Sequence, residues 1–185
     1  MKSKLLFVSL LVVTATVFSG CQKVSSLLDI KVNTTFKAPM NMTATATPAI
    51  SNTASYTYSG TYTVVPKDNA EVEKYANKIK DATITSITAT FTNVSTPVTV
   101  SQYSIHIKDL TNNVTATYLS NGFNITEGGS YTFDFTGQNA PFLTYLESSM
   151  SDADQIQITA TAVGDANATF TMTLNIGTTF TVNPL

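Results

Sequence analysis

The sequence predicts an all-β fold, an antiparallel β-sandwich with one or two short helices. Threonine supplies 33 of the 185 residues, and its β-branched side chain fits a pleated, half-buried surface better than a helix. Apolar and polar residues alternate along most of the chain, which is the period of a strand with one buried face. Charged residues make up only 12%, so hydroxyl and amide side chains must cover the exposed faces.

The first two predicted strands lie in segments 28–36 and 56–64, where apolar residues alternate with polar ones. Gly60 predicts a bulge or kink in the second strand. The segment between them, 39–54, is rich in Thr, Ala and Asn and predicts a weak strand followed by a loop. The alternating residues are Leu28, Ile30, Val32 and Phe36, then Tyr56, Tyr58, Tyr62 and Val64.

A helix is predicted to begin at Asp68. Asp68 and Glu71 have the spacing of a capping box with Asp as the cap. Val72, Tyr75 and Ile79 then recur at helical spacing, which predicts one face packed on a sheet. The lysines Lys74, Lys78 and Lys80 would face water.

The middle of the chain predicts three more strands, at 84–93, 98–108 and 114–119, because apolar residues again alternate with Thr and Ser. The last two are joined by residues 109–113, whose Asn112-Asn113 pair suits a turn.

The segment Glu127-Gly128-Gly129-Ser130 separates two alternating stretches, 123–125 and 131–135, and this arrangement predicts a hairpin. Pro141 precedes apolar residues that continue to Met150, which predicts a second short helix because Pro is tolerated in the first turn.

The last two strands give the clearest predicted hairpin. Segments 156–162 and 170–176 alternate on either side of the turn at 164–167, and a closing strand, 178–182, follows Gly177. One-sided alternation in about eight to ten strands predicts antiparallel sheets, two of which press together as a sandwich of Ig-like character. No linker or fixed-period repeat divides residues 28–185, so we expect a single β-sandwich domain there.

The N-terminus has the three-part layout of a signal peptide. Lys2 and Lys4 precede an apolar run, which ends at Ser19-Gly20 just before Cys21. The run is shorter than the roughly 20 apolar residues of a membrane span. We expect residues 1–20 to be removed and residues 21–27 to form a lipidated Cys and a polar tether.

Residues 17–21, Val-Phe-Ser-Gly-Cys, resemble a lipobox, and Cys21 is the one cysteine of the chain. The layout is similar to that of the small, Thr- and Asn-rich β-sandwich lipoproteins of the Bacteroidota envelope. This resemblance implies a lipid on the Cys21 sulfur, acylation such as palmitate and a place in the bacterial outer membrane, and it implies no particular activity. Phe18 departs from the usual Leu. No acidic run follows Cys21, so the periplasmic and outer faces both fit.

Charge and composition exclude several function classes. With a net charge of −2 and no basic stripe, we expect no nucleic-acid partner. His106 is the one histidine, on the polar side of its strand, so the usual zinc sets and a Ser/His/acid triad are not available. The carboxylates of Asp152, Asp154 and Asp165 could supply oxygen ligands to calcium, but their spacing does not match that of an EF-hand loop. We expect no enzymatic activity, no cofactor and no bound metal.

Two functions fit this sequence. The first is a non-catalytic binding or structural module that is anchored to the envelope and contacts another envelope protein through a sheet edge or an end loop. The second is a carbohydrate-binding lipoprotein of a glycan-uptake system, with Tyr56, Tyr58 and Tyr62 or loop amides as its site. Exposed tyrosines would favour the second function and buried tyrosines the first.

Overall fold

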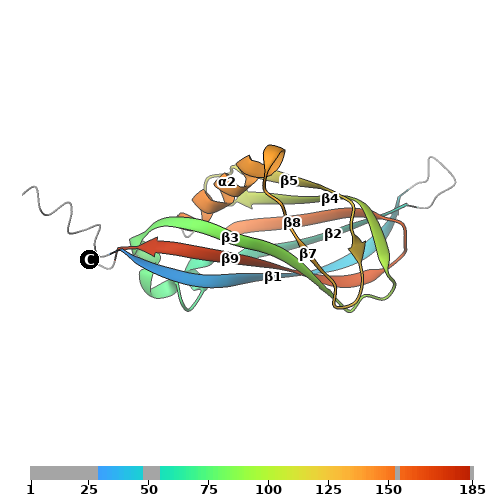
Figure 1. The fold of residues 1–185 in the computed structure, drawn as a ribbon, viewed down its shortest axis with the longest axis horizontal. Helices are drawn as coiled ribbons and strands as arrows, with labels where there is room; N and C mark the ends of the chain where they lie inside the picture. Colours follow the sequence, from blue (N-terminus) through green and yellow to red (C-terminus); the bar gives the residue numbers. More distant parts are fainter. Residues whose placement is uncertain (1–28, 48–54, 153–154, 184–185) are drawn as a thin grey trace, which may run out of the picture.

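The computed structural model describes residues 29–47, 55–152 and 155–183, and within them the predicted antiparallel β-sandwich is confirmed (Figure 1). The signal peptide, Cys21 and the tether lie outside the described residues. The strands are β1 Ile30–Thr47, β2 Ser55–Val64, β3 Ile79–Thr92, β4 Val98–Asp109, β5 Thr115–Asn121, β6 Asn124–Ile125, β7 Ser130–Thr132, β8 Ile156–Gly164 and β9 Thr169–Val182. The helices are α2 Ala140–Ser151 and the short 3-10 helices η1 Pro66–Asp68, η2 Glu73–Lys78 and η3 Gly137–Asn139.

The strands form one sheet that is folded into two layers (Figure 1). Their order is β5-β4-β8-β2-β1-β9-β3-β7, every paired neighbour is antiparallel, and β6 pairs with β4. Strand β1 connects the layers, because it pairs with β9 from Ile30 to Thr43 and with β2 from Thr43 to Thr47. The β5-β4-β8-β2 layer therefore faces the β1-β9-β3-β7 layer.

Aromatic side chains hold the two layers together. The rings of Tyr58 on β2 and Phe170 on β9 pack with centroids 5.2 Å apart. Tyr103 on β4 donates its O–H to Sδ of Met172 on β9 at 3.4 Å, and its ring stacks on Phe133 at 5.6 Å. Each such pair contributes about 0.5–1.5 kcal/mol beyond its buried area.

The last two strands lie where they were predicted, but they are not a hairpin. Strand β8 pairs with β2 and β4, whereas β9 pairs with β1 and β3. The turn at 164–167 therefore carries the chain from one layer to the other. Both strands bury every second residue, and that pattern is the same for a hairpin and for an arch. The predicted closing strand, 178–182, is the continuation of β9 past Gly177.

The predicted hairpin at 123–135 is also wrong. Strand β6 pairs with β4 in one layer, and β7 pairs with β3 in the other. Residues 126–129 cross between them, with Gly128 in the left-handed region at φ 70°. The Glu127 carboxylate accepts a hydrogen bond from the backbone N–H of Val94 at 2.7 Å, so this crossing is tied to the loop after β3.

The helix predicted from Asp68 is replaced by two short 3-10 helices, η1 and η2. Asn69, not Asp68, accepts the N–H of Glu71, at 2.9 Å. Val72 and Tyr75 are three residues apart, which suits a 3-10 turn as well as an α-helix, and the N–H of Tyr75 bonds to the carbonyl of Val72 at 2.8 Å. Strand pairing with β9 then begins at Ile79, five residues before the predicted strand.

The second predicted helix, α2, is confirmed and bridges the two layers. Glu147 accepts the backbone N–H of Ile84 on β3 at 2.9 Å. The Tyr145 O–H donates to the carbonyl of Val114 at 2.5 Å, and its oxygen accepts the N–H of Asp109 at 3.2 Å. The helix thus covers one side of the sandwich between β3 and β5 (Figure 1).

Strand β1 is longer than predicted and runs through Pro39. Pro39 pairs with Thr173 of β9, but β2 pairs with β1 only from Thr43 onward, so the other side of β1 has no strand partner at Pro39 and a missing N–H is tolerated there. Gly60 makes no bulge, since the β2–β8 register is regular across it. A Cβ there would lie 2.6 Å from Sδ of Met42 and 2.9 Å from Cβ of Met40, so Gly60 allows β2 to approach β1.

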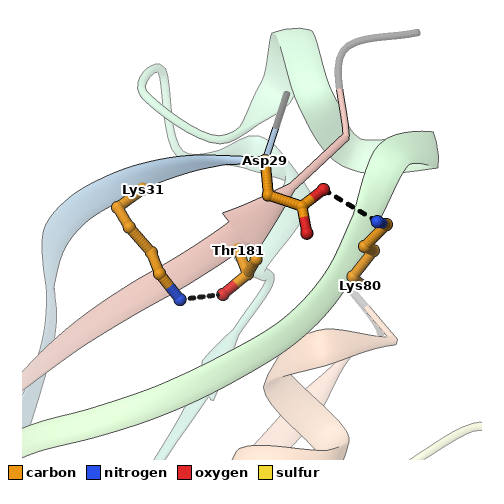
Figure 2. A network of polar contacts seen from close by, with 4 residues as sticks. All are labelled: Asp29, Lys31, Lys80 and Thr181. Atoms are coloured by element: carbon orange, nitrogen blue, oxygen red, sulfur yellow. Dashed lines mark hydrogen bonds and ion pairs between the residues drawn. The ribbon is translucent and has the colours of Figure 1, made fainter. Parts of the chain in front are cut away.

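The chain joins the sheet beside a small polar network (Figure 2). Lys80 on β3 forms an ion pair with Asp29 at 2.7 Å. Lys31 donates to the Thr181 hydroxyl on β9. These contacts fix the start of β1 against β9 and β3, at the end of the domain that any tether from Cys21 must reach.

Candidate binding groove

A groove of about 780 Å³ runs along β5. We call it the β5 groove. Its lining comes from residues 101–104 of β4, residues 118–121 of β5, two residues of β8, and the segment that runs from β7 to η3. The last two groups are Thr161 and Val163, then Tyr131, Asp134, Thr136, Gln138 and Asn139. The bulge in β4 between Val100 and Gln102 reverses which residues face outward at the start of this lining.

One wall of the groove is fixed by hydrogen bonds. The Asn139 side chain donates to the carbonyl of Leu119 at 3.0 Å and accepts its N–H at 3.1 Å, so it occupies the free edge of β5 as another strand would. The hydroxyls of Ser120 and Tyr131 lie 2.9 Å apart. This wall is therefore held in place before any ligand arrives.

Three amide side chains in the groove are free to bind. Within the part of the chain that the structure describes, those of Gln102, Asn121 and Gln138 make no hydrogen bond, and all three residues are exposed. Each amide has two N–H donors and one carbonyl acceptor. They come from β4, β5 and η3, so only the tertiary structure brings them to one groove.

The groove also has an apolar contact surface. Leu119 is 54% exposed and lines the same groove as the free amides. Tyr131 offers less surface, because its ring stacks on Phe123 with centroids 4.3 Å apart.

The electrostatics of the groove are close to neutral. Among the described residues that line it, Asp134 is the one charged side chain, and its carboxylate already accepts the N–H and hydroxyl of Thr136 at 3.0 and 3.1 Å. Burial raises the pKa of Tyr103 and the pKa of Tyr118 above their ordinary value. Both phenols therefore stay protonated, and the floor of the groove carries no charge.

A second, shallower hollow of about 450 Å³ lies on the outer face of the β1-β9-β3 layer. It forms around Gly177, where a Cβ would lie 2.7 Å from the hydroxyls of Thr85 and Ser86. Its lining is entirely Thr, Ser, Asn and Gly, without an apolar or free amide cluster like that of the β5 groove.

The three tyrosines of the predicted ligand site do not form an exposed platform. Tyr58 is 0% exposed and donates its O–H to the carbonyl of Ala166. Tyr56 is half-buried, and Tyr62 is 37% exposed. Tyr58 therefore has no free face on which a sugar could stack.

Two of the titratable residues considered from the sequence, His106 and Asp165, have local hydrogen-bond partners. His106 is exposed on β4, as predicted, with Nδ1 3.0 Å from the Thr117 hydroxyl. Asp165 accepts the N–H of Thr99 at 2.8 Å, a bond that lowers its pKa. Asp154 lies outside the described residues, and among those described no group of three or more His, Cys, Asp or Glu could hold a metal ion.

Sequence reasoning missed the β5 groove. Gln102, Asn121 and Gln138 are ordinary polar residues of strand faces and turns, and nothing in their spacing predicts that they meet. Asn139, two residues before the Pro141 that marks the predicted helix, is the closest to a sequence signal, since Asn is a common helix cap. Here its side chain caps β5 instead.

No protein-family model and no curated protein matches this chain. Among solved structures it is similar to that of Desmodium yellow mottle tymovirus, with a TM-score of 0.29, 10% identity and coverage of 83% of this chain and 84% of that one. It is also similar to the C-terminal family 22 carbohydrate-binding module of Clostridium thermocellum Xyn10B, with a TM-score of 0.28, 10% identity and coverage of 80% and 86%. The structure of Turnip yellow mosaic virus gives a TM-score of 0.27 at 10% identity, and the match covers 80% of this chain and 93% of that one. Such low scores carry no functional argument.

No helix among the described residues is both long and apolar enough to cross a bilayer.

Proposed function

We propose that this chain is a lipid-anchored protein of the bacterial outer membrane, that it acts as a non-catalytic binding module, and that the β5 groove is its binding site. The observation that carries the proposal is the combination of a fixed wall at Asn139 with free amides at Gln102, Asn121 and Gln138. Such a surface suits non-covalent binding, because its free groups are amides that donate and accept hydrogen bonds.

The anchor rests on the sequence alone. Asp29 lies eight residue steps after Cys21, so this stretch of chain spans at most about 29 Å. Each lipid CH₂ that is buried contributes about 0.8 kcal/mol, and two chains give stable anchoring. An anchored domain would therefore remain near the bilayer, with the Asp29 end of the sandwich closest to it.

Metabolic labelling with radioactive palmitate tests the anchor. Wild-type protein is expected to take up label and to sediment with the membranes. Cys21→Ser is expected to lose the label and to enter the soluble fraction or retain its signal peptide. A labelled Cys21→Ser protein would contradict lipidation at this residue.

A photo-cross-linking amino acid tests the groove as the binding site. Placed at Leu119 in the full-length protein within its own envelope, it is expected to yield an adduct of defined mass. The matched control is Leu110, which is 42% exposed but lies in the turn after β4, outside the groove. Equal adducts at the two positions, or none at Leu119, would contradict the proposal.

A partner protein that binds along β5 is the second candidate. It is favoured by the position of β5 at the end of the strand order, since an edge strand offers backbone groups to another chain, but Asn139 already occupies those of Leu119. The mass and protease sensitivity of the Leu119 adduct separate this candidate from a small or polymeric ligand.

A further inference from the structure

We propose that the β5 groove binds an uncharged carbohydrate chain. This inference rests on the proposed function, because it names the ligand class of the same site. It does not use the tyrosines of β2, of which Tyr58 is buried, and it depends on residues of β4, β5 and η3.

The free hydrogen-bonding groups match sugar hydroxyls. A hydroxyl both donates and accepts, and so does an amide side chain. Gln102, Asn121 and Gln138 supply three amides without partners among the described residues. The hydroxyls of Ser104 and Thr161 line the same groove. A ligand rich in hydroxyls can therefore find donors and acceptors along the groove.

Leu119 supplies the complementary apolar contact. A pyranose ring has C–H faces as well as hydroxyl edges, and removing apolar surface from water favours binding. Leu119 is the most exposed large hydrophobic side chain among the described residues. Its position beside the free amides allows one sugar unit to contact both kinds of surface.

The charge of the groove selects against acidic ligands. No lysine lies among its described lining residues, and its one charged side chain is the carboxylate of Asp134. A uronate or phosphate would meet that carboxylate with no cation among the described lining residues. A neutral glycan would instead donate a hydroxyl to Asp134, since an ionised carboxylate accepts hydrogen bonds.

The wall of the groove is already ordered, so less entropy is lost when a carbohydrate chain binds. Ordering a flexible site on binding costs conformational entropy for each immobilised side chain. Asn139 already fixes the backbone of Leu119, and Thr136 already holds Asp134. The groove volume of about 780 Å³ lies within the usual range for ligand sites.

Affinity electrophoresis of the full-length protein in detergent tests the inference. The probes are neutral polysaccharides (xylan, glucomannan, mixed-linkage β-glucan and starch), with polygalacturonate and alginate as acidic counterparts. We expect at least one neutral polysaccharide to retard the protein and the acidic ones to retard it less.

Variants then place the binding in the groove. Gln102→Ala and Asn121→Ala are each expected to weaken binding about two- to thirteenfold, the effect of losing one hydrogen bond. Gln157→Ala is the matched control, because Gln157 lies on β8 opposite Lys108 and outside the groove. Leu119→Ala is compared with Leu110→Ala in the same way. Thermal unfolding verifies that every variant is folded.

The outcomes distinguish this inference from the proposed function. Failure of every neutral polysaccharide to bind, stronger binding of the acidic ones, or neutral binding that Gln102→Ala and Asn121→Ala leave unchanged would each overturn the carbohydrate assignment. A specific adduct at Leu119 in the same protein would then still support the groove as a binding site. Loss of the adduct together with the glycan signal would overturn both.

Discussion

The side-chain amide of Asn139 pairs with both backbone groups of Leu119, donating to the carbonyl at 3.0 Å and accepting the N–H at 3.1 Å. This contact connects η3 to the exposed edge of β5. It positions the one strongly exposed leucine of the β5 groove, and it occupies backbone groups that would otherwise be open to another strand.

Replacing Asn139 should therefore destabilise both the free edge of β5 and the wall of the β5 groove. Asn139→Ala removes two hydrogen bonds and is expected to lower the free energy of unfolding by about 1–2 kcal/mol, as measured by urea denaturation. Gln138→Ala, at an exposed neighbour without such contacts, is the control and should change stability by less than about 0.5 kcal/mol. Equal effects of the two substitutions would show that the Asn139 contact is not stabilising.

Gly60 is expected to be required for the close approach of β1 and β2. Gly60→Ala places a Cβ against Met42 and Met40 and should cost about 1–3 kcal/mol, because overpacking strains a close-packed core. In a Met42→Ala background, the cost should fall by at least about 0.5 kcal/mol, since the sulfur is gone. An identical cost in both backgrounds would contradict this contact as the cause.

Thr178 is expected to be a site where removing a hydroxyl stabilises the protein. The residue is 2% exposed, and its Oγ1 has no hydrogen-bond partner among the described residues. Thr178→Val removes an unpaired polar group at nearly constant shape and should raise the free energy of unfolding by about 1 kcal/mol. Thr179→Val, where the hydroxyl donates to Asn33 at 2.7 Å, should not stabilise. Destabilisation by Thr178→Val would indicate a bound water.

Asp109 should contribute a pH-dependent part of the stability. Its burial raises the pKa, but hydrogen bonds from Asn112 and Thr111 outweigh that effect and hold the pKa below its usual 3.8. A depressed carboxyl pKa stabilises the fold fully above the unfolded value, and the contribution disappears as the pH falls through the folded value.

Urea unfolding of wild type and Asp109→Asn between pH 7 and pH 2.5 measures this contribution. The difference in free energy between them is expected to be constant from neutral pH to about pH 5 and to shrink below pH 3.8. Asp68→Asn, at an exposed residue of η1, is the control. A difference for Asp109→Asn that did not change with pH would contradict the assignment.

The alternation of apolar and polar residues predicted the positions of the strands better than it predicted which strands pair. The alternation at Ile156, Ile158 and Ala160 correctly placed β8, and Phe170, Met172 and Leu174 correctly placed β9. The same alternation is produced whether two strands pair with each other or face each other across a core. The predicted hairpins at 123–135 and 156–176 failed for this reason.

The helix predicted from Asp68 failed for another reason. The i,i+3 spacing of Val72 and Tyr75 is shared by 3-10 and α-helices, and strand pairing from Ile79 onward left no room for further turns. Pro141, by contrast, marked the start of α2 correctly, because a ring that fixes φ and lacks an N–H is suited to the first turn of a helix.

By itself, the sequence determined which side chains β8 and β9 bury, because period-two alternation depends only on residues that are adjacent along the chain. Only the tertiary structure decided which strands pair, because pairing depends on long-range packing such as that of Tyr58 on Phe170 and on the arch between β8 and β9. The β5 groove belongs to this second class. Gln102, Asn121 and Gln138 are solvent-facing residues of separate elements, and only the folding of one sheet into two layers brings them to a common surface.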